Sequence, residues 1–324
     1  MAKTAVILAG GLGTRLRPLT YTTPKPLLPV VNRPMILRLI DTFPEDVSRV
    51  VIAVSYMAEK IREFFEKNDC GREVIVVNET TPLGTGGAIR NVREYLTDTF
   101  FVFNADNFSS LNLKEMEKFH IKHGGIGTIA LWEVENPEAY GVVKLDVDNR
   151  ILAFKEKPKL SEAPSRKINA GMYIFKKQIL EFIPEGEVSL ERAVFPSVLD
   201  HGLYGFEFQG YWIDCGKPKE FLDTNRFLLT HGLGKIESQI EGYLLEPVAV
   251  GKNLSGKGYT LGPNTCIGNN CTIHEGTIIT DSVIFDDVII GNNVKVERSI
   301  IGNNVKISPG QVIIDRVVGD GEQL

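Results

Sequence analysis

Several features are scarce in this sequence, and each scarcity excludes a class of protein. The 324 residues carry a formal net charge of −5, so the chain lacks the basic excess of a nucleic-acid-binding protein. No apolar run approaches the roughly 18 residues that a membrane helix requires. The opening stretch MAKTAVILAGG holds too short an apolar run for a signal peptide. We therefore expect a cytoplasmic protein whose partners are neither nucleic acids nor membranes.

Cysteine is also scarce, and its pattern argues against disulfides and zinc. Only four cysteines are present, and no two of them have the Cys-x-x-Cys spacing; they are Cys70, Cys215, Cys266 and Cys271. The sequence therefore predicts reduced cysteines. With this ordinary composition, a chain of this length is expected to fold into about two domains.

Two familiar phosphate-binding motifs are missing as well. The P-loop motif GxxxxGK[ST] does not occur, and the dinucleotide motif GxGxxG fails because Leu16 stands where its third glycine would be. The first apolar run instead leads into LAGGLGTRLRPLTYTTPKPLLPV, residues 8–30, which combines three glycines with cationic side chains. Glycine lets a backbone approach a ligand closely, and cations beside it favour an anionic ligand. This stretch predicts a phosphate site.

Four groups of this stretch suit a bound phosphate. They are the backbone amides of Leu12 and Gly13 and the side chains of Arg15 and Lys25.

Up to about residue 230, short β-branched runs alternate with helical patterns. Strands are predicted at 4–8, 49–54, 73–77 and 99–104, and helices at 34–43, 57–68, 86–96 and 113–124. This alternation predicts an α/β fold with a mostly parallel sheet covered on both faces. Denser strands follow at 127–134, 140–146, 150–157 and 168–175, and two helices near 190–202 and 218–232. They predict an antiparallel or mixed extension of the sheet.

From about residue 245 the apolar pattern changes to a period of five or six residues. Eleven positions keep this register, namely Leu261, Ile267, Ile273, Ile279, Ile284, Ile290, Val296, Ile301, Ile307, Ile313 and Val318. The segment also repeats itself after 17 residues, with Gly-Asn-Asn at its corners. A six-residue period of this kind predicts a parallel β-helix in which each short strand adds one apolar residue to an interior column. The predicted domains are 1–230 and 245–324, joined by a linker at 231–244.

The motifs together resemble the sugar-1-phosphate nucleotidylyltransferases, and most closely their mannose-1-phosphate guanylyltransferase branch. The resemblance runs through nearly the whole chain and includes GTRLRPLT, TPKPLLPVVNRPMI, PLGTGGA, YGVV, EKP, KINAGMYI and GYWIDCGKPKEFL. It implies a Rossmann-like nucleotidyltransferase domain followed by a left-handed β-helix of hexapeptide repeats. It also implies transfer of a nucleotidyl group from a nucleoside triphosphate, with GTP favoured, to a sugar 1-phosphate with release of pyrophosphate.

The resemblance assigns roles to particular residues. Arg15 would hold the leaving pyrophosphate and Lys25 the reacting phosphates. Asp106, which comes after a predicted strand where ligands collect in an open α/β sheet, is a natural ligand for Mg²⁺. Asp214 in WIDCG resembles the second metal carboxylate of the family. The catalytic set expected from the sequence is Arg15, Lys25, Asp106, Lys157 and Asp214.

Further residues are expected to bind the two substrates. Lys157 in EKP resembles the lysine that grips the sugar phosphate, while Glu156 and Asn169 resemble residues that hydrogen-bond sugar hydroxyls. Gly141 would let the backbone approach the sugar. The expected nucleotide-binding positions are Leu8, Gly10, Gly11, Leu12, Gly13, Glu79, Pro82, Gly84 and Thr85.

The expectation that the base is guanine rests on Glu79. The stretch NETTPLGTGGA resembles the segment that reads the base, and Glu79 falls where relatives that use uridine or thymidine nucleotides tend to place glutamine. Guanine presents two adjacent donors, and an ionised glutamate, which only accepts, matches both.

Alternatives remain open at this point. The same transfer could use glucose 1-phosphate with dTTP or UTP. The β-helix could carry a second, acyltransferase activity, for which His274 is the one histidine available in the tail. A non-catalytic regulatory homologue is a third reading, although all the key residues of the motifs are present. The β-helix is expected to bring copies of the chain together as a homo-oligomer.

Overall fold

The computed structural model describes residues 3–324 and divides by its contacts into two compact units. The first unit comprises the residues up to Gly11 together with Leu39–Ile213. The second comprises Leu12–Arg38 together with Asp214–Leu324. The glycine-rich stretch is therefore shared between the units. The domain boundaries predicted from the sequence stay a prediction.

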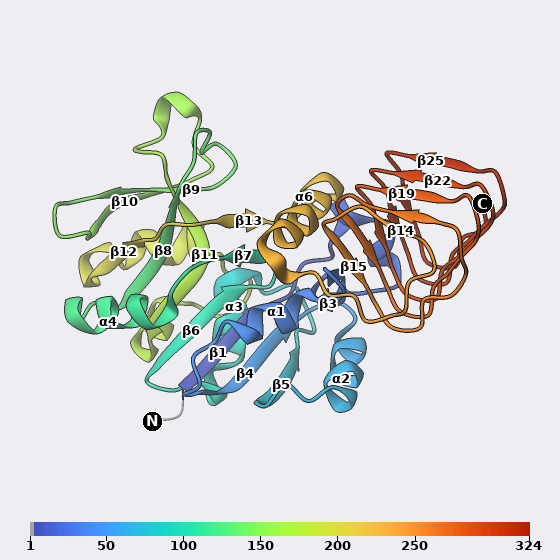
Figure 1. Ribbon diagram of the computed structural model, residues 1–324. Helices are drawn as coiled ribbons and strands as arrows, with labels where there is room; N and C mark the ends of the chain where they lie inside the picture. The colour runs from blue at the N-terminus through green and yellow to red at the C-terminus, as the bar shows by residue number, and fades with distance from the viewer. Residues whose placement is uncertain (1–2) are drawn as a thin grey trace. The chain divides into compact units, whose positions relative to one another are not determined.

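The first unit is built on a nine-stranded sheet. Its strand order is β10-β9-β11-β6-β1-β4-β5, with β8 paired to β11 and β12 (Figure 1). The strands are β1 Lys3–Leu8, β4 Val47–Val54, β5 Glu73–Asn78, β6 Thr99–Asn104, β8 Gly127–Glu133, β9 Gly141–Leu145, β10 Ile151–Glu156, β11 Lys167–Lys176 and β12 Leu203–Glu207. The neighbours β5, β4, β1 and β6 run parallel, and β11 joins β6 antiparallel. The predicted parallel sheet with a mixed extension is confirmed.

Helices of the first unit are amphipathic and join successive strands. They are α2 Ala58–Lys67, α3 Gly84–Asn91 and α4 Leu113–His123, whereas α1, Met35–Asp41, begins in the second unit and ends in the first. Asn112 caps α4 by accepting a hydrogen bond from the amide of Glu115, and Gly124 ends the helix with a φ of 69°. Two short strands, β7 Asn107–Ser109 and β13 Trp212–Asp214, form a small separate sheet.

The helix predicted at 190–202 is wrong as a continuous element. A π turn, Leu190–Val194, is followed by three α-helical residues, α5 Phe195–Ser197, and by a 3₁₀ turn, Leu199–His201. Pro196 has no amide to donate a helical hydrogen bond, although Phe195 before it keeps the α-helical φ and ψ values of −58° and −46°. The α-helical residues end at Val198, whose φ and ψ are −107° and 7°.

The second unit contains the parallel β-helix. Its strands form three sheets, in the orders β14-β16-β19-β22-β25, β15-β17-β20-β23-β26 and β18-β21-β24 (Figure 1). The strands are β14 Tyr243–Leu244, β15 Val248–Val250, β16 Thr260–Leu261, β17 Thr265–Ile267, β18 Thr272–Ile273, β19 Ile278–Thr280, β20 Val283–Ile284, β21 Ile289–Ile290, β22 Lys295–Glu297, β23 Ile300–Ile301, β24 Lys306–Ile307, β25 Val312–Ile314 and β26 Val317–Val318.

The eleven apolar positions singled out by the repeat all point into the β-helix. None of them is more than 3% exposed. Each corner of the coil turns through a residue in the left-handed region; Asn270, Asn293 and Asn304 have φ values of 57°, 54° and 59°. Asparagine tolerates this conformation better than most residues, which explains the Gly-Asn-Asn corners. The predicted β-helix is confirmed.

The rest of the second unit is helix α6 and the cationic segment. Helix α6, Pro218–Leu228, begins with proline, whose ring suits the first turn of a helix. The segment 12–38 folds as three 3₁₀ turns, Thr14–Leu16, Leu19–Tyr21 and Lys25–Leu27, and a hairpin of β2 Pro29–Val30 and β3 Arg33–Pro34.

No helix within residues 3–324 combines the length and the apolar character needed to cross a bilayer. In the same range none of the four cysteines is in a disulfide, as the sequence predicts.

Candidate functional site

The cationic loop is shaped by Gly13. Its φ is 62°, and a Cβ placed there would lie only 2.9 Å from Cγ2 of Thr20. The buried Thr20 hydroxyl donates to the carbonyl of Gly13 at 2.9 Å and closes the loop. Lys25 packs against the same glycine, because its Cβ would be 3.4 Å from a Cβ there. Gly13 thus allows an otherwise strained turn and brings Lys25 to it.

Arg15 lies beside the residues that come after Asp214. A Cβ on Gly216 would be 2.8 Å from Nη2 of Arg15, so a side chain at position 216 would displace the guanidinium. The amide of Gly216 donates to a carboxylate oxygen of Glu220 at 3.0 Å, within the first turn of α6. The DCG turn therefore holds Arg15 and Asp214 within one local structure of the second unit.

Glu79 and Gly10 meet in the first unit. Glu79 is 7% exposed and comes directly after β5, and its amide donates to the carbonyl of Val54 at 2.8 Å. A Cβ on Gly10 would lie 3.4 Å from Oε1 of Glu79. Burial raises the pKa of the Glu79 carboxyl, and the amide of Leu83, which donates to Oε2 at 3.4 Å, offsets part of that rise. The Glu79 carboxylate, a hydrogen-bond acceptor, thus faces Gly10.

The start of α3 is fixed by the segment around Val188. Gly84 has a φ of 66°, and the amide of Gly86 donates to the carbonyl of Val188 at 2.7 Å. Thr85 donates to Glu191 at 2.8 Å and accepts from the amide of Leu190 at 2.8 Å. Pro82 is exposed just before this turn. The turn that contains Gly84 and Thr85 is therefore held by hydrogen bonds to residues 188–191.

Glu156 lies across the ladder from Gly141. The two residues pair in β9 and β10, and a Cβ on Gly141 would be 2.9 Å from Oε2 of Glu156 and 2.4 Å from Cζ of Phe154. The sequence suggests that Gly141 makes room for a ligand; in the structure, the glycine first makes room for Phe154 and Glu156. Lys157 comes next with a φ of 47°, and its Nζ lies 3.8 Å from Oε1 of Glu156.

Asn169 is fixed at both ends of its amide. Its Oδ1 accepts from the amide of Gly171 at 2.9 Å, and its Nδ2 donates to the hydroxyl of Tyr173 at 2.9 Å. A break in the β11–β8 register between Asn169 and Tyr173 leaves room for this arrangement. The Asn169 amide is therefore held in one orientation.

Sequence reasoning missed Glu191. Its Oε2 accepts from Thr85 at 2.8 Å and from the hydroxyl of Ser189 at 2.7 Å. Burial, and then the negative charge of Glu191, raise the pKa of the Glu156 carboxyl. Glu191 thus links the α3 turn electrostatically to Glu156. The signal available was Ser189, a helix-capping residue with a glutamate in the first turn after it.

Asp106 and Asp214 flank the small two-stranded sheet. Asp106 comes directly before β7, and Asp214 is the last residue of β13, the strand that pairs with β7. The amide of Ala105 donates to the carbonyl of Leu8 at 3.2 Å, which places Asp106 at the carboxyl end of β6. Within residues 3–324 no group of three or more acidic, histidine or cysteine side chains is arranged to hold a metal.

Comparisons with known proteins agree over both parts of the chain. A family model described as nucleotidyl transferase matches residues 4–231, and one described as the GMPPB C-terminal domain matches residues 245–322. Mannose-1-phosphate guanylyltransferase catalytic subunit beta of Danio rerio is 39% identical over 276 residues, covering 83% of this chain and 74% of that protein. Mannose-1-phosphate guanylyltransferase of Mycobacterium tuberculosis is 36% identical over 301 residues, covering 91% and 83%.

A solved structure extends the likeness to three dimensions. HddC from Yersinia pseudotuberculosis, complexed with GMP-PN, is 31% identical and superimposes with a TM-score of 0.60. The match covers 70% of this chain and 99% of HddC.

Proposed function

The chain belongs to the nucleotidyl transferase family, among the mannose-1-phosphate guanylyltransferases, and we propose that it converts GTP and mannose 1-phosphate to GDP-mannose and pyrophosphate. A phosphate oxygen of the sugar phosphate forms a bond to the α-phosphorus of GTP. The bond from that phosphorus to the oxygen that bridges the α- and β-phosphates breaks in line, and this oxygen leaves with the pyrophosphate. The site must place these groups and neutralise charge that moves toward the pyrophosphate.

The choice of base rests on Glu79. Its carboxylate lies beside Gly10, at the start of the stretch whose glycines and cations suit the triphosphate. A carboxylate has acceptors only, so it matches the N1–H and N2–H₂ of guanine and leaves the donor–acceptor edge of adenine poorly served. A base held at Glu79 lies beside Gly10, the first glycine of that stretch.

The other residues fall into two groups by the substrate that they serve. Arg15 and Lys25 hold the phosphates of the triphosphate, and Leu12 and Gly13 offer amides to them. Lys157 contacts the phosphate of mannose 1-phosphate, and Glu156 and Asn169 bind its hydroxyls. The fixed amide of Asn169 supports its role, since this side chain is oriented before a ligand arrives. Glu156 lies 3.8 Å from Nζ of Lys157, so that groups for the hydroxyls and for the phosphate are neighbours.

Magnesium is the proposed cofactor, and the donor chemistry fits it. Mg²⁺ takes oxygen ligands and is bound through one or two carboxylates together with substrate phosphates. Asp106 and Asp214 are partly exposed carboxylates, the first between strands β6 and β7 and the second at the end of β13. Bound there, the ion would neutralise phosphate charge in the transition state.

Two further proposals concern the whole protein. We expect copies of the chain to associate through the β-helix, and we place the protein in the cytoplasm because its reaction consumes a nucleoside triphosphate. The alternatives are uridylyl or thymidylyl transfer to glucose 1-phosphate, and an added acyltransferase activity of the β-helix.

Pyrophosphate release tests the proposal directly. GTP, UTP, dTTP and ATP are each supplied with mannose 1-phosphate or glucose 1-phosphate and Mg²⁺, and kcat/KM is compared. The expected result is a preference of about tenfold or more for GTP with mannose 1-phosphate. A preference for UTP or dTTP would reject guanylyl transfer and retain nucleotidyl transfer.

A further inference from the structure

The cationic segment 12–38 takes its shape from the β-helix unit. It groups with Asp214–Leu324 and, before helix α1 begins at Met35, has only 3₁₀ turns and a short hairpin of its own. A segment with so little regular structure depends on anchors outside itself to stay in one conformation. Two anchors are visible, one on each side of Lys25.

The first anchor is in the last coil of the β-helix. The hydroxyl of Thr22 donates to Oδ2 of Asp320 at 2.7 Å. Close by, Gly319 faces Pro18, and a Cβ on Gly319 would lie 3.1 Å from Cβ of Pro18. The segment between Arg15 and Lys25 is therefore packed directly on this coil.

Asp320 is itself held by the coil beneath it. Its Oδ1 accepts from the amide of Asn303 at 2.7 Å, and Nδ2 of Asn303 lies 3.2 Å from both carboxylate oxygens. One carboxylate thus fixes a corner of the β-helix and receives the Thr22 hydroxyl. Asp286 bonds to Asn269 in the same way, with 2.6 Å from Oδ1 to the amide, and its carboxylate bonds to Asn269 alone among residues 3–324.

The second anchor is at the hairpin turn. Val31 and Asn32 have φ values of 47° and 57°, a conformation that is unusual for a buried, β-branched valine. The amide of Val31 donates to Oδ1 of the buried Asn225 in α6 at 2.7 Å, and Nδ2 of Asn32 donates to the carbonyl of Ile267 at 2.7 Å. Strained turns persist where the surroundings determine them, and here α6 and a coil do so.

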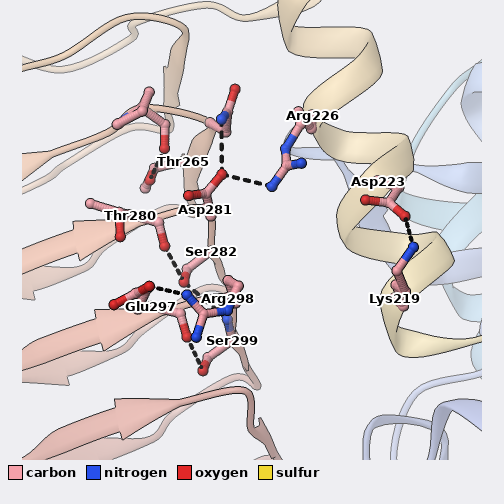
Figure 2. Close-up of polar contacts among 12 residues, drawn as sticks. Lys219, Asp223, Arg226, Thr265, Thr280, Asp281, Ser282, Glu297, Arg298 and Ser299 are labelled. Carbon is pink, nitrogen blue, oxygen red and sulfur yellow. Dashed lines mark hydrogen bonds and ion pairs between the residues drawn. The ribbon is translucent and has the colours of Figure 1, made fainter.

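Helix α6 is in turn attached to the coils. Figure 2 shows Arg226 reaching from α6 to Asp281, at 2.8 Å, and Asp281 also accepts from Asn264 at 2.8 Å. Asn225, the neighbour of Arg226, has its Nδ2 bound to the carbonyl of Phe221 at 2.8 Å, so its Oδ1 is directed toward Val31. The second anchor is thus continuous with the β-helix.

We propose that Asp320 and Asn225 are positioning residues for the nucleoside triphosphate, because they hold the segment that carries Arg15 and Lys25 on the β-helix. The inference rests on the proposed function for the identity of the ligand. Thr20, two residues before Thr22, closes the loop on Gly13, against which Lys25 packs. A shift at Thr22 therefore moves the loop that places Lys25. The β-helix is then part of the nucleotide site as well as an assembly module.

Variants at Thr22 and Asp320 test the first anchor in the full chain. Thr22→Val removes the hydroxyl but keeps the shape of the side chain. Thr22→Ser keeps the hydroxyl, and Asp320→Ala removes the acceptor. We expect the Val and Ala variants to raise the KM for GTP about tenfold, with the KM for mannose 1-phosphate unchanged and the Ser variant like wild type. The double variant Thr22→Val/Asp320→Ala should be no worse than Asp320→Ala alone.

Asp286→Ala is the matched control. It removes the equivalent bond to an asparagine amide, two coils away from Asp320. It should lower the melting temperature about as much as Asp320→Ala does, yet leave the KM for GTP unchanged. If Asp286→Ala raises that KM as much as Asp320→Ala, the effect is general destabilisation and the inference is wrong.

Hydrogen exchange separates this inference from the proposed function. In protein without ligand, the amides of residues 13–25 should lose protection in Thr22→Val and Asp320→Ala but not in Asp286→Ala. Unchanged protection in Asp320→Ala would overturn the inference whichever triphosphate the wild type uses. If the wild-type protein releases no pyrophosphate from any triphosphate, the proposed function is wrong. In that case, lost protection in Thr22→Val and Asp320→Ala would still support the anchor.

Discussion

Glu156 faces Gly141 across the β9–β10 ladder so closely that a Cβ on the glycine would lie 2.9 Å from Oε2. Gly141→Ala should therefore displace the carboxylate, and we expect the KM for mannose 1-phosphate to rise about tenfold while the KM for GTP changes little. Overpacking against Phe154 should also lower the free energy of unfolding by about 1–3 kcal/mol.

Gly205→Ala is the control for this overpacking. A Cβ there would meet Cδ1 of Leu131 at 2.4 Å, away from Glu156. It should destabilise the protein and leave both KM values near those of wild type. Equal effects of the two variants on the sugar-phosphate KM would contradict a binding role for Glu156.

Asp106→Asn tests the proposed metal site. The substitution removes one charged ligand where charge moves in the transition state, so kcat should fall by about 100-fold or more with circular dichroism unchanged. Titration with Mg²⁺ should show weaker activation. Asp148→Asn, at an exposed turn, is the control and should match wild type. Turnover near wild type in Asp106→Asn would remove Asp106 from the metal site.

Glu79→Gln tests how the base is read. The glutamine amide presents a donor as well as an acceptor, so the preference of kcat/KM for GTP over UTP should narrow by about tenfold. Burial raises the pKa of the Glu79 carboxyl. As pH falls, this carboxyl should therefore protonate, and GTP binding should weaken, at a higher pH than with an exposed glutamate. Glu63→Gln, on the exposed side of α2, should change neither property.

Because of His120, we expect the folded protein to lose stability in mild acid. Burial, and then the charge of Lys176, lower its pKa from 6.5 to about 4, and its Nε2 is buried without a hydrogen-bond partner among residues 3–324. Between these values the unfolded chain binds a proton that the folded chain does not. Stability should thus fall by on the order of 3 kcal/mol as pH drops from 6.5 to 4.

Denaturant unfolding at several pH values checks this effect. His120→Gln should flatten the pH dependence in that window, whereas His274→Gln, at an exposed position, should not. An unchanged slope for His120→Gln would mean that other groups cause the acid sensitivity.

The outer face of one β-helix sheet is the expected contact between copies of the chain. Tyr243, Ile278 and Val312 lie on β14, β19 and β25 and are 75%, 44% and 61% exposed. Ile278→Lys/Val312→Lys should lower the molar mass measured by light scattering, since two charges would be placed in an apolar contact. Val147→Lys, 97% exposed in the first unit, should not. An unchanged mass would exclude this face.

Regular parts of the fold could be predicted because periodicity is a local property. The column from Leu261 to Val318 is visible in the sequence, since each coil repeats the same short strand and corner. The changes of helix type on either side of Phe195–Ser197 could not be predicted, because the apolar pattern of this segment remains helical. A periodic pattern does not register the one amide that Pro196 lacks.

Candidate site residues could be proposed only where a motif contains them. Motifs single out Arg15, Lys25 and Glu156 as candidates, whereas Glu191 belongs to no motif and contacts Thr85, 106 residues earlier in the chain. The grouping of segment 12–38 with the β-helix depends on pairs such as Thr22 and Asp320, which are 298 residues apart. No spacing in the sequence connects such residues.

The bond between Thr22 and Asp320 has a consequence for how the protein is made. A ribosome completes Thr22 long before its partner, which is added another 298 residues later. A nascent chain that already holds every motif for the triphosphate therefore lacks the anchor that sets their geometry. Nascent chains stalled just before and just after residue 320 has left the ribosome should differ in GTP capture, so that activity begins with the final coil.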